Sequence, residues 1–439
     1  MGKGPGCTRM NDRTTIRRDP VIESEVVEVD VLVVGGGPAG LTAAYTLKRH
    51  AQNLRVLLID SRDRIGTPVR CAELTHKNLF EVIGLEPRDG WIRWILEKSE
   101  GLIVIDRARV EAGLARHLES MGVCVEEGSS LIGIQEHDGA GRMTLVESDT
   151  GVKRVWARLV IAADGVSSST ASLAGISSPL ALDQLCSCLA YRIEGAWLEE
   201  PANVMFDFRP ELEGHYFWII PSGIDEASVG VGVPPHLGEG LQNRLDAIIR
   251  ECPLIEGGRV TSTVVGSYPA VRAARRVHAD GLIVVGGAAR LVDALSGEGI
   301  RQAVHSGRLA AELALERGPD NLGEEDLAEF AERLSPIYEH LDEEIEKFHS
   351  LRDRFGRSAA KRLMVSDRVI AKLNQECTGC TGCVALCPTQ AIRVIPRGIE
   401  VREDQCIGCG HCVWECGVRG MEIHDPRSSI DYSGGTRQT

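Results

Sequence analysis

The sequence predicts an α/β protein in which a Rossmann-like nucleotide-binding domain carries an antiparallel sheet, a helical segment and a small C-terminal α+β domain. Three observations lead to this fold class. A glycine-rich motif lies between a buried strand and a helix near the N-terminus, residues 185–275 alternate between polar and apolar side chains, and a doubled cysteine run lies near the C-terminus. With 439 residues the chain is long enough for two or three domains.

The overall composition is ordinary for a globular protein, with an excess of acidic residues. Hydrophobic residues make up 43% and charged residues 26% of the chain, and the formal net charge is -14. This negative charge argues against a nucleic-acid partner. No apolar run is long enough to cross a bilayer, and the N-terminus lacks the apolar core of a signal peptide. We therefore expect a cytoplasmic protein.

The first predicted elements form a β-α-β unit. Residues 1–28 are polar and rich in Arg and Gly, which predicts a disordered arm. The β-branched run Val29–Val34 is typical of a buried parallel strand, Pro38–His50 has the pattern of a helix, and Arg55–Asp60 is the next strand. The turn after the first strand therefore lies at a helix N-terminus, where anions bind.

That turn reads Gly-Gly-Gly-Pro-Ala-Gly and fits G-x-G-x-x-G, with Gly35, Gly37 and Gly40 at the motif positions and Ala39 between the last two. The glycines let the backbone approach a pyrophosphate. Asp60 ends the next strand about 20 residues on, where its carboxylate can accept hydrogen bonds from an adenosine ribose. Because strand, motif, helix, strand and acid follow in order, we interpret the turn as a dinucleotide site rather than a chance Gly-rich turn.

The doubled cysteine run has the pattern C-x-x-C-x-x-C-x-x-x-C in each copy, with Pro388 after the first. This is the ligand spacing of a bacterial-type ferredoxin with two 4Fe–4S clusters, in which the fourth cysteine of each run binds the other cluster. The alternative is structural zinc, but zinc sites usually combine two cysteine pairs. The predicted cluster ligands are Cys377, Cys380, Cys383 and Cys416 for one cluster and Cys387, Cys406, Cys409 and Cys412 for the other.

Of the 14 cysteines, eight belong to these runs, and the other six need no disulfide framework in a reducing compartment. Cys186 and Cys188 share one face of a predicted strand. They could form a redox pair, but packing as small apolar residues is the more common role of buried cysteines.

Later motifs indicate which dinucleotide is bound. Ala163–Ser167 follows the predicted strand Arg158–Ala163, and the predicted strand Gly281–Val285 leads into Gly286–Ala289 and then Asp293–Ile300. This order and spacing resembles the glutathione-reductase-like FAD proteins of the hydroxylase branch. The resemblance implies bound FAD.

The same resemblance implies roles for single residues. Asp164 and Gly165 lie near the flavin and Gly286 belongs to the FAD site, while the flavin edge is lined by Gly297, Glu298, Gly299 and Ile300. Gly287 departs from the family, which usually has an Asp that contacts the ribityl–phosphate region, and Arg290 is a candidate to compensate. There is no second dinucleotide fingerprint, which fits electrons arriving through the ferredoxin-like unit.

Two further stretches resemble the geranylgeranyl reductases: Ile65–Glu73, similar to their G-x-P-V-R-C-G-E segment, and Gly214–Pro221, similar to their Y-x-W-x-F-P strand. The first implies that Arg70, Cys71 and Glu73 lie by the isoalloxazine, with Ala72 in place of the family Gly. The second implies that a Tyr and a Trp line a lipid cavity. In archaea this family saturates the isoprenoid chains of membrane ether lipids, and in photosynthetic organisms it makes the phytyl chain.

The implied roles are Tyr216 and Trp218 as substrate-binding residues and Cys71 with Glu73, or Tyr216, as proton relays. The two aromatic residues share a strand face and could instead be core aromatics. Cys71 alone would more often be a small buried apolar residue. The sequence does not choose between the two relays.

We expect a reductase that acts on CH–CH groups, with an isoprenoid ether lipid as substrate and an external ferredoxin as donor. The expected segments are a disordered arm at 1–28, an FAD-binding domain at 29–184 and 276–320, an antiparallel substrate-binding domain at 185–275, a helical segment at 321–373, a ferredoxin domain at 374–425 and a disordered tail at 426–439.

The basic stretch Arg357–Lys372 could form an amphipathic helix on an anionic membrane, which would make the protein peripheral at the inner face of the cell membrane. A solvated face, or a seat for the ferredoxin unit, is the other interpretation. Two other functions stay open. One is an electron-transfer-flavoprotein:quinone-type oxidoreductase, which usually carries a single cluster, and the other is a non-catalytic electron-transfer subunit.

Overall fold

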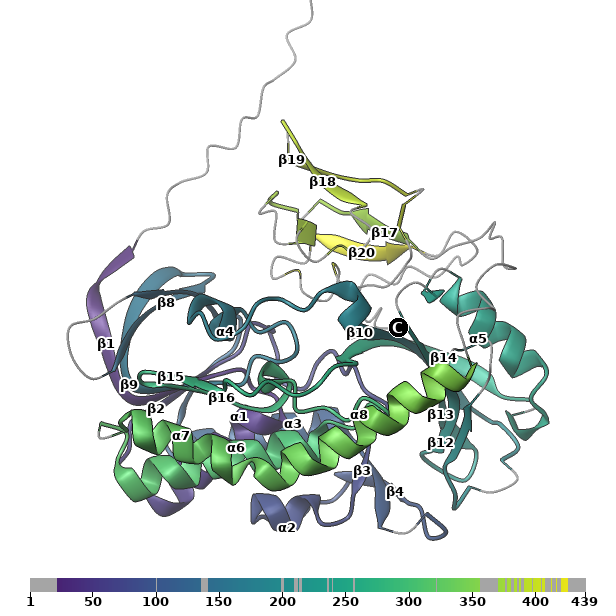
Figure 1. Ribbon diagram of the computed structural model, residues 1–439, viewed down its shortest axis with the longest axis horizontal. Coiled ribbons are helices and arrows are strands. Elements are labelled where there is room, and N and C mark those ends of the chain that lie inside the picture. Colours follow the sequence, from purple (N-terminus) through teal and green to yellow (C-terminus); the bar gives the residue numbers. More distant parts are fainter. Residues whose placement is uncertain are drawn as a thin grey trace, which may run out of the picture.

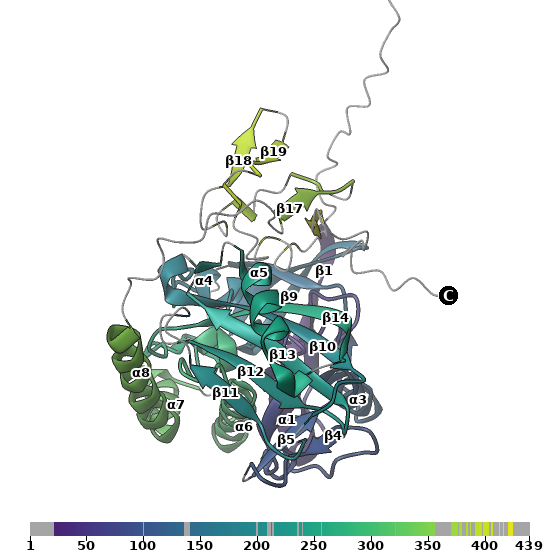
Figure 2. The ribbon, with the colours of Figure 1, turned by 90° about the vertical axis from the view of Figure 1, so that its right-hand side faces the viewer.

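The computed structural model describes two parts of the chain, residues 22–355 and 370–424, each with short gaps. The gaps are residues 100, 136–140, 199–200, 209–211, 213–214, 235–236, 239, 256 and 321 in the first part, and 376, 380–382, 385–386, 388–390, 397, 404, 407–411, 413–415 and 417–419 in the second. The first part is a body of two large sheets with helices packed on them. The strands of the second part stand outside these sheets in both views (Figure 1 and Figure 2).

The nucleotide-binding half is built, within the described residues, on an eight-stranded sheet in the order β15-β16-β9-β1-β2-β6, with β7 and β8 attached to β9. Val31, Leu32 and Val33 of β1 are fully buried and lie between β2 and β9, as expected of a parallel strand with a continuous apolar run. The strands are β1 (Ile22–Val34), β2 (Val56–Ile59), β6 (Cys124–Glu126), β7 (Ser130–Gln135), β8 (Arg142–Ser148), β9 (Gly151–Ala162), β15 (His278–Ala279) and β16 (Leu282–Val284).

Helix α1 (Pro38–His50) is the central helix of this half and packs along α3 (Arg107–Ser120) and α6 (Ile300–Arg317). Gly307 allows the close approach of α6, because a Cβ there would overlap the Ala39 carbonyl. Short elements complete the half: α2 (Leu79–Ile83), α4 (Ser169–Leu173) and the 3-10 turns Leu182–Gln184 and Gly286–Ala289.

The second sheet is antiparallel, with the described strands in the order β11-β12-β13-β10-β14. Its outer face carries Leu189 and Phe217 and packs under α5 (Leu241–Arg250), which Figure 2 shows lying over the strands. The strands are β10 (Leu185–Glu194), β11 (Met205–Phe208), β12 (Tyr216–Pro221), β13 (Glu226–Val233) and β14 (Arg259–Pro269), and the 3-10 turn Pro253–Ile255 precedes β14.

The opposite side of this sheet is named here the inner face and carries Cys186, Cys188, Ala190, Tyr216 and Trp218. Part of it packs against a small sheet of the nucleotide-binding half, in the order β3-β5-β4. Those strands are β3 (Leu74–His76), β4 (Ile92–Ile95) and β5 (Leu102–Ile105).

Two helices follow, α7 (Glu324–Arg333) and α8 (Ser335–Phe355). Pro336 lies in the first turn of α8, where its missing N–H costs no helical hydrogen bond, so the helix is not interrupted. Figure 1 shows α8 running from α7 toward the second sheet, and its Phe348 packs with Ala294.

The C-terminal unit has two antiparallel pairs, β17 (Ile370–Leu373) with β20 (Met421–His424) and β18 (Ile392–Ile395) with β19 (Gly398–Val401). Because β17 pairs with the last strand of the unit, the unit begins at residue 370 and not at 374. The expected helical segment 321–373 is therefore wrong at its end, and Lys372 is a strand residue. Residues 357–369 of the predicted basic helix lie outside the described residues.

The expected disordered arm at 1–28 is also wrong in part, because residues 22–28 belong to β1 and Val26 to Val29 pair with β9. The β-branched residues of this stretch suit a strand, and exposed positions such as Glu28 gave it a polar composition. Residues 1–21 and the tail 426–439 lie outside the described residues. Among the described helices, none has the length and apolar character to cross a membrane.

Candidate flavin and iron–sulfur sites

The glycine-rich turn between β1 and α1 has the geometry of a pyrophosphate cradle. Gly35 has a φ of 110°, and a Cβ there would overlap the Ala163 carbonyl. A Cβ at Gly40 would overlap the Gly35 carbonyl. Gly37 is the N-cap of α1, and no heavy atom of the described residues lies within 4 Å of its ideal Cβ. The turn therefore leaves room for a phosphate where unpaired helix N–H groups favour negative charge.

Asp60 lies just after β2, as the sequence predicts, but the protein itself holds its carboxylate. Gly36 N–H donates to Oδ2 at 2.6 Å, and the main chain and side chain of Arg62 each donate to Oδ1 at 2.8 Å. Arg62 also pairs with Glu111 of α3 at 3.0 Å. Burial alone would lower the pKa of Arg62, but the hydrogen bonds to Asp60 and the charge of Glu111 raise it above its ordinary value. Arg62 thus shapes the predicted ribose site, although no motif marks it.

The predicted pair Asp164 and Gly165 follows β9. The carboxylate of Asp164 accepts hydrogen bonds from Ser168 Oγ at 2.5 Å and from Thr170 N–H at 2.9 Å, so it stabilises the start of α4. Gly165 has a φ of 83°, and its ideal Cβ also faces open space among the described residues. Gly165 therefore leaves room for a ligand, whereas the Asp164 side chain is engaged with the protein.

The turn at Gly286 and Gly287 approaches the same place. An ideal Cβ at Gly287 would lie 3.4 Å from the main chain of Gly165, so the missing Asp side chain lets these two turns come close. Arg290, the candidate to compensate, donates to the Ser178 carbonyl at 3.0 Å, and burial lowers its pKa.

The segment before α6 contacts the second sheet. Gly297 has a φ of 70°, and its ideal Cβ would lie 3.1 Å from the ring of Tyr268 in β14. Gly299 is the N-cap of α6 and Ile300 its first residue, while Glu298 accepts a hydrogen bond from Arg301 N–H at 3.1 Å. The predicted flavin-edge residues thus present a helix N-terminus, a position that favours anionic groups.

The loop carrying Arg70, Cys71 and Glu73 joins the two sheets. Glu73 is 1% exposed and has a φ of 66°, a conformation that costs a non-glycine residue on the order of 1–3 kcal/mol. Its carboxylate accepts a hydrogen bond from Arg107 N–H at 2.8 Å and pairs with Arg192 of β10. Cys71 Sγ accepts a hydrogen bond from Glu73 N–H at 3.2 Å, and Arg70 is exposed. Glu73 therefore positions the loop, and its predicted part in proton transfer stays a prediction.

Tyr216 and Trp218 lie together on the inner face, as the period-2 spacing predicts. Tyr216 O–H donates to the Ser296 carbonyl, and Trp218 N–H donates to Ser228 Oγ at 3.3 Å. Burial raises the pKa of Tyr216. Both side chains are buried in a core cluster, which agrees with the core-aromatic interpretation, and their role as a substrate lining stays a prediction.

The sequence did not single out two residues of the inner-face region, His215 and Tyr268, which lie against Cys186. Strand pairing brings Tyr268 opposite Cys186, and that register is not readable from a local motif. Only the spacing of Cys186 and Cys188 on β10 offered a signal.

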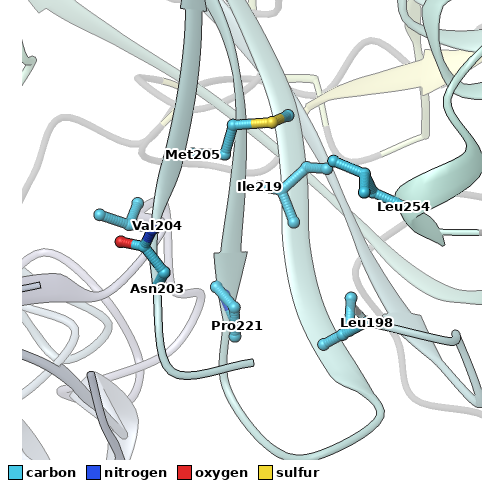
Figure 3. Close-up of a pocket in the computed structure, with 7 residues that line it drawn as sticks. All are labelled: Leu198, Asn203, Val204, Met205, Ile219, Pro221 and Leu254. Atoms are coloured by element: carbon cyan, nitrogen blue, oxygen red, sulfur yellow. The ribbon is translucent and has the colours of Figure 1, made fainter. Parts of the chain in front are cut away.

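An apolar cavity of about 210 Å³ lies at one end of the second sheet (Figure 3). Its lining residue Ile219 alternates with Trp218 along β12 and belongs to the outer-face core, so this cavity is on the other side of the sheet from Tyr216 and Trp218. The cavity is lined by Leu198, Asn203, Val204, Met205, Ile219, Pro221 and Leu254.

The C-terminal cysteines gather in one small core. None of the described ones forms a disulfide. Cysteine thiolates are the ligands that hold 4Fe–4S clusters. Cys380 and Cys409 lie outside the described residues. The six that are described and share this core are Cys377, Cys383, Cys387, Cys406, Cys412 and Cys416.

Main-chain contacts place the fourth cysteine of the first run beside the second run. Cys387 Sγ accepts a hydrogen bond from Ala391 N–H at 3.2 Å. The Ala391 carbonyl binds Arg402 N–H at 2.7 Å, and the Arg402 carbonyl binds Cys406 N–H at 3.1 Å. Cys387 is therefore close in the fold to Cys406, as the predicted ligand set requires.

The second run repeats this arrangement. Cys416 Sγ accepts a hydrogen bond from Gly420 N–H at 3.1 Å, and a Cβ at Gly420 would overlap the main chain of Cys377. Cys416 thus lies beside the first run. The crossed ligand sets stay a prediction, and these contacts support them.

Three family models match the chain: an NAD(P)-binding Rossmann-like domain at residues 33–84, an FAD dependent oxidoreductase at 71–313 and a 4Fe-4S dicluster domain at 370–417. Digeranylgeranylglycerophospholipid reductase 1 of Methanopyrus kandleri is 33% identical over 66% of this chain and 81% of its own length. The chain belongs to the digeranylgeranylglycerophospholipid reductase family. The Thermoplasma volcanium reductase is 30% identical over 79% of this chain and 89% of its own.

Membership of this reductase family makes the chain an FAD-dependent oxidoreductase that acts on carbon–carbon double bonds, and its cofactors are FAD and 4Fe–4S clusters. The predictions of FAD and of iron–sulfur rather than zinc are confirmed. The open cradles at Gly37 and Gly165 fit a bound dinucleotide.

Solved structures confirm the predicted fold class. A geranylgeranyl bacteriochlorophyll reductase-like protein from Thermoplasma acidophilum has a TM-score of 0.69 and 26% identity, covering 76% of this chain and 89% of that one. The p-nitrophenol 4-monooxygenase of Pseudomonas putida has a TM-score of 0.60 at 17% identity, covering 76% and 94%, and shows the same fold alone.

Proposed function

We propose that this reductase saturates isoprenoid double bonds of membrane ether lipids, with electrons passing from an external ferredoxin through two 4Fe–4S clusters to FAD. One observation carries the proposal: a body related to digeranylgeranylglycerophospholipid reductases is joined in one chain to a dicluster unit. The names of these relatives support an ether-lipid substrate.

Bound FAD supplies hydride transfer. The chain would hold it at the open turns of Gly37 and Gly165 and at the helix N-terminus that begins at Ile300. The Asp60–Arg62 pair shapes the ribose end of this site. These residues bind and orient the cofactor, and the second sheet closes the opposite side.

An isolated trisubstituted alkene has no neighbouring carbonyl to activate it. The site must therefore exclude water and deliver a proton while hydride is transferred. The buried inner face with Tyr216 and Trp218 suits an apolar chain, and the loop fixed by Glu73 positions Cys71. Because both Glu73 oxygens are bound within the protein, Cys71 and Tyr216 remain the relay candidates among the residues implied by the family.

The proposed electron path follows from the fusion of a flavin-binding body and a dicluster unit in one chain. A quinone-type flavoprotein usually carries one cluster, and the dicluster match favours a ferredoxin-like entry for single electrons. A relay subunit would not need a reductase body. Because the lipid lies in a membrane, we also propose peripheral contact with the inner face of the cell membrane, testable by co-sedimentation with vesicles of the lipid.

Anaerobic incubation of the holoenzyme with geranylgeranyl ether lipid tests the proposal, read by mass spectrometry as a gain of two hydrogens per double bond. We expect turnover both with chemical reductant and with reduced ferredoxin. Cys406→Ala should keep turnover with chemical reductant and lose turnover with ferredoxin, because it interrupts electron transfer through the clusters and leaves the flavin site intact. Absence of any lipid product with either donor would overturn the lipid assignment, and turnover with NADPH alone would overturn the donor.

A further inference from the structure

Exposed apolar side chains gather at one end of the second sheet. Trp197, in the loop after β10, is 76% exposed, and Ile224, in the turn between β12 and β13, is 67% exposed. A hydrogen bond of 3.1 Å from Ala196 N–H to the Asp225 carbonyl brings this loop and this turn together. Val260, 47% exposed, lies at the same end, because the start of β14 pairs with the end of β10. Polar residues are the usual choice for loop tips, so these apolar ones indicate a contact surface.

The hairpin between β4 and β5 belongs to the same end. Its residue Ile95 is 59% exposed. The hairpin is tied to the loop after β10, since Trp94 Nε1–H donates to the Pro201 carbonyl at 2.6 Å and Lys98 N–H donates to the Ala202 carbonyl at 3.0 Å. The surface is named here the apolar end and is defined by Ile95, Trp197, Ile224 and Val260.

The apolar cavity of Figure 3 adjoins this end, because its lining residue Leu198 follows Trp197 in the chain. Its volume of about 210 Å³ exceeds that of apolar cavities of about 150 Å³ that bind small hydrocarbons. The side-chain carbonyl of Asn203, a polar lining residue, accepts a hydrogen bond from Ser99 Oγ at 2.6 Å and is thus engaged within the protein. The cavity therefore suits part of an apolar chain better than a polar ligand.

The charged residues around the apolar end carry both signs. Glu97 and Lys98 are exposed neighbours in the β4–β5 hairpin, and Asp225 is exposed beside Ile224. Glu194 pairs with Arg259 at 3.2 Å. These residues give no excess of positive charge that would attract anionic lipid headgroups. A partner of this end is therefore recognised through its apolar part.

A lipid bilayer fits this end better than a second protein chain. The apolar side chains come from loop tips and strand ends of both halves, which suits insertion into a fluid layer. Trp is enriched at membrane interfaces, because its ring is apolar and its N–H can stay with the headgroups. In both views β4 lies on the side away from β17 and β20, so a membrane here would leave the C-terminal unit open to an external donor (Figure 1 and Figure 2).

We propose that the apolar end docks on the bilayer that holds the substrate, with Trp197 and Ile224 inserted among the lipids and one hydrocarbon chain in the adjoining cavity. The inference rests on the proposed function and names the surface that meets the membrane. It differs from docking through the basic stretch Arg357–Lys372, which would need anionic lipid. Binding through the apolar end depends on buried apolar area, so neutral and anionic vesicles should bind alike.

Co-sedimentation of the anaerobic holoenzyme with vesicles tests the surface, using phosphatidylcholine alone and phosphatidylcholine mixed with phosphatidylglycerol. Trp197→Ser combined with Ile224→Ser should lower the partition coefficient about tenfold or more, because two large apolar side chains lose their burial. The matched control combines Ile132→Ser with Leu173→Ser, which are 42% and 47% exposed on β7 and α4, and it should bind as the native protein does. Unchanged binding of the first double variant, or binding that needs anionic lipid and is lost at high salt, would overturn the proposal.

Phosphatidylcholine with a photoreactive group at the end of one chain tests the cavity. Mass spectrometry should find the label on Met205 or Leu254, which line it. Absence of label from both residues would overturn the place given to the chain. Gel filtration tests the competing occupant: a native dimer that the Trp197→Ser, Ile224→Ser variant converts to a monomer would assign this end to a second copy and overturn the proposal.

Turnover by the chemically reduced holoenzyme separates this inference from the proposed function. The Trp197→Ser, Ile224→Ser variant should reduce detergent-dispersed geranylgeranyl lipid at the native rate and the same lipid in vesicles about tenfold more slowly. Bound FAD, iron and melting temperature show that the variant is folded. An equal loss of rate in detergent would overturn the docking role. A native enzyme that binds neutral vesicles through this end but forms no lipid product would overturn the proposed function alone.

Discussion

Two groups of cysteines differ in how they are built. In the C-terminal unit each cysteine run lies within one short stretch of chain, and the spacing itself fixes where the thiols meet. On the inner face, Cys186 and Cys188 meet Gly232 and Tyr268 only because β13 and β14 pair with β10. Local spacing reveals a metal site, whereas the state of a buried thiol depends on strand pairing.

The largest effect is expected when one cysteine of each group is replaced, one in the C-terminal runs and one on the inner face. Cys406→Ala should lower bound iron from about eight to about four atoms per chain and leave FAD in place, because one 4Fe–4S cluster loses a ligand. Cys186→Ala should leave both iron and FAD unchanged. Iron analysis and the visible spectrum of protein purified without oxygen measure this. An unchanged iron content in Cys406→Ala would show that Cys406 is not a cluster ligand.

Loss of FAD is the next effect in size. Gly37→Leu should give protein without flavin and with full iron, because the side chain fills the open space at the N-terminus of α1. Gly323 is a matched control: it is also a helix N-cap with extended backbone, at the start of α7. Gly323→Leu should keep its FAD. Full flavin absorbance in Gly37→Leu would show that the pyrophosphate lies elsewhere.

The sequence predicted those parts of the molecule that are local. The β-α-β start, the turn at Gly35–Gly40 and the cysteine runs depend on residues close in the chain. The strand role of residues 22–28 depends on pairing with β9, and the start of the C-terminal unit depends on the pairing of β17 with β20. Both were missed because a strand is defined by a partner distant in sequence.

The same reason separates the predicted site residues from the missed ones. Asp60 was found by its distance from the glycine motif, but Arg62, which holds it, follows no motif. Glu73 was found by resemblance, yet its positive φ and its pairing with Arg192 on another sheet define what it does. A sequence motif identifies a residue, but the contacts of its side chain depend on the folded structure.

The ion pair of Glu73 and Arg192 should contribute to the stability of the protein, because it joins two sheets. Arg192→Ala should lower the free energy of unfolding by about 2 kcal/mol, less than the 3–5 kcal/mol for breaking a fully buried pair, because a quarter of the Arg192 side chain is exposed. Arg259, paired with Glu194 on the surface of the same sheet, is the control, and Arg259→Ala should cost at most about 1 kcal/mol. Denaturant unfolding with matched cofactor content measures both. Equal costs would mean that Glu73 needs no partner.

A pH dependence of stability that the C-terminal cysteines should not share follows from the buried thiol of Cys186. Burial would raise the pKa of Cys186, but Cys188, His215 and Tyr268, with Tyr216 one step further away, lower it below its ordinary value of 9.0 in the folded protein. Between the lowered and the ordinary value, the unfolded thiol binds a proton that the folded thiolate does not, so stability rises with pH by at most about 1.4 kcal/mol per pH unit. This stability is lost as the pH falls toward the lowered pKa of the folded thiol. The raised pKa of Cys188 acts only above the same window. The melting temperature of the native protein should therefore fall relative to that of Cys186→Ser as the pH is lowered from 9 toward 5, while Cys252→Ser follows the native curve. Parallel curves for native protein and Cys186→Ser would mean that the inner-face thiol is an ordinary one.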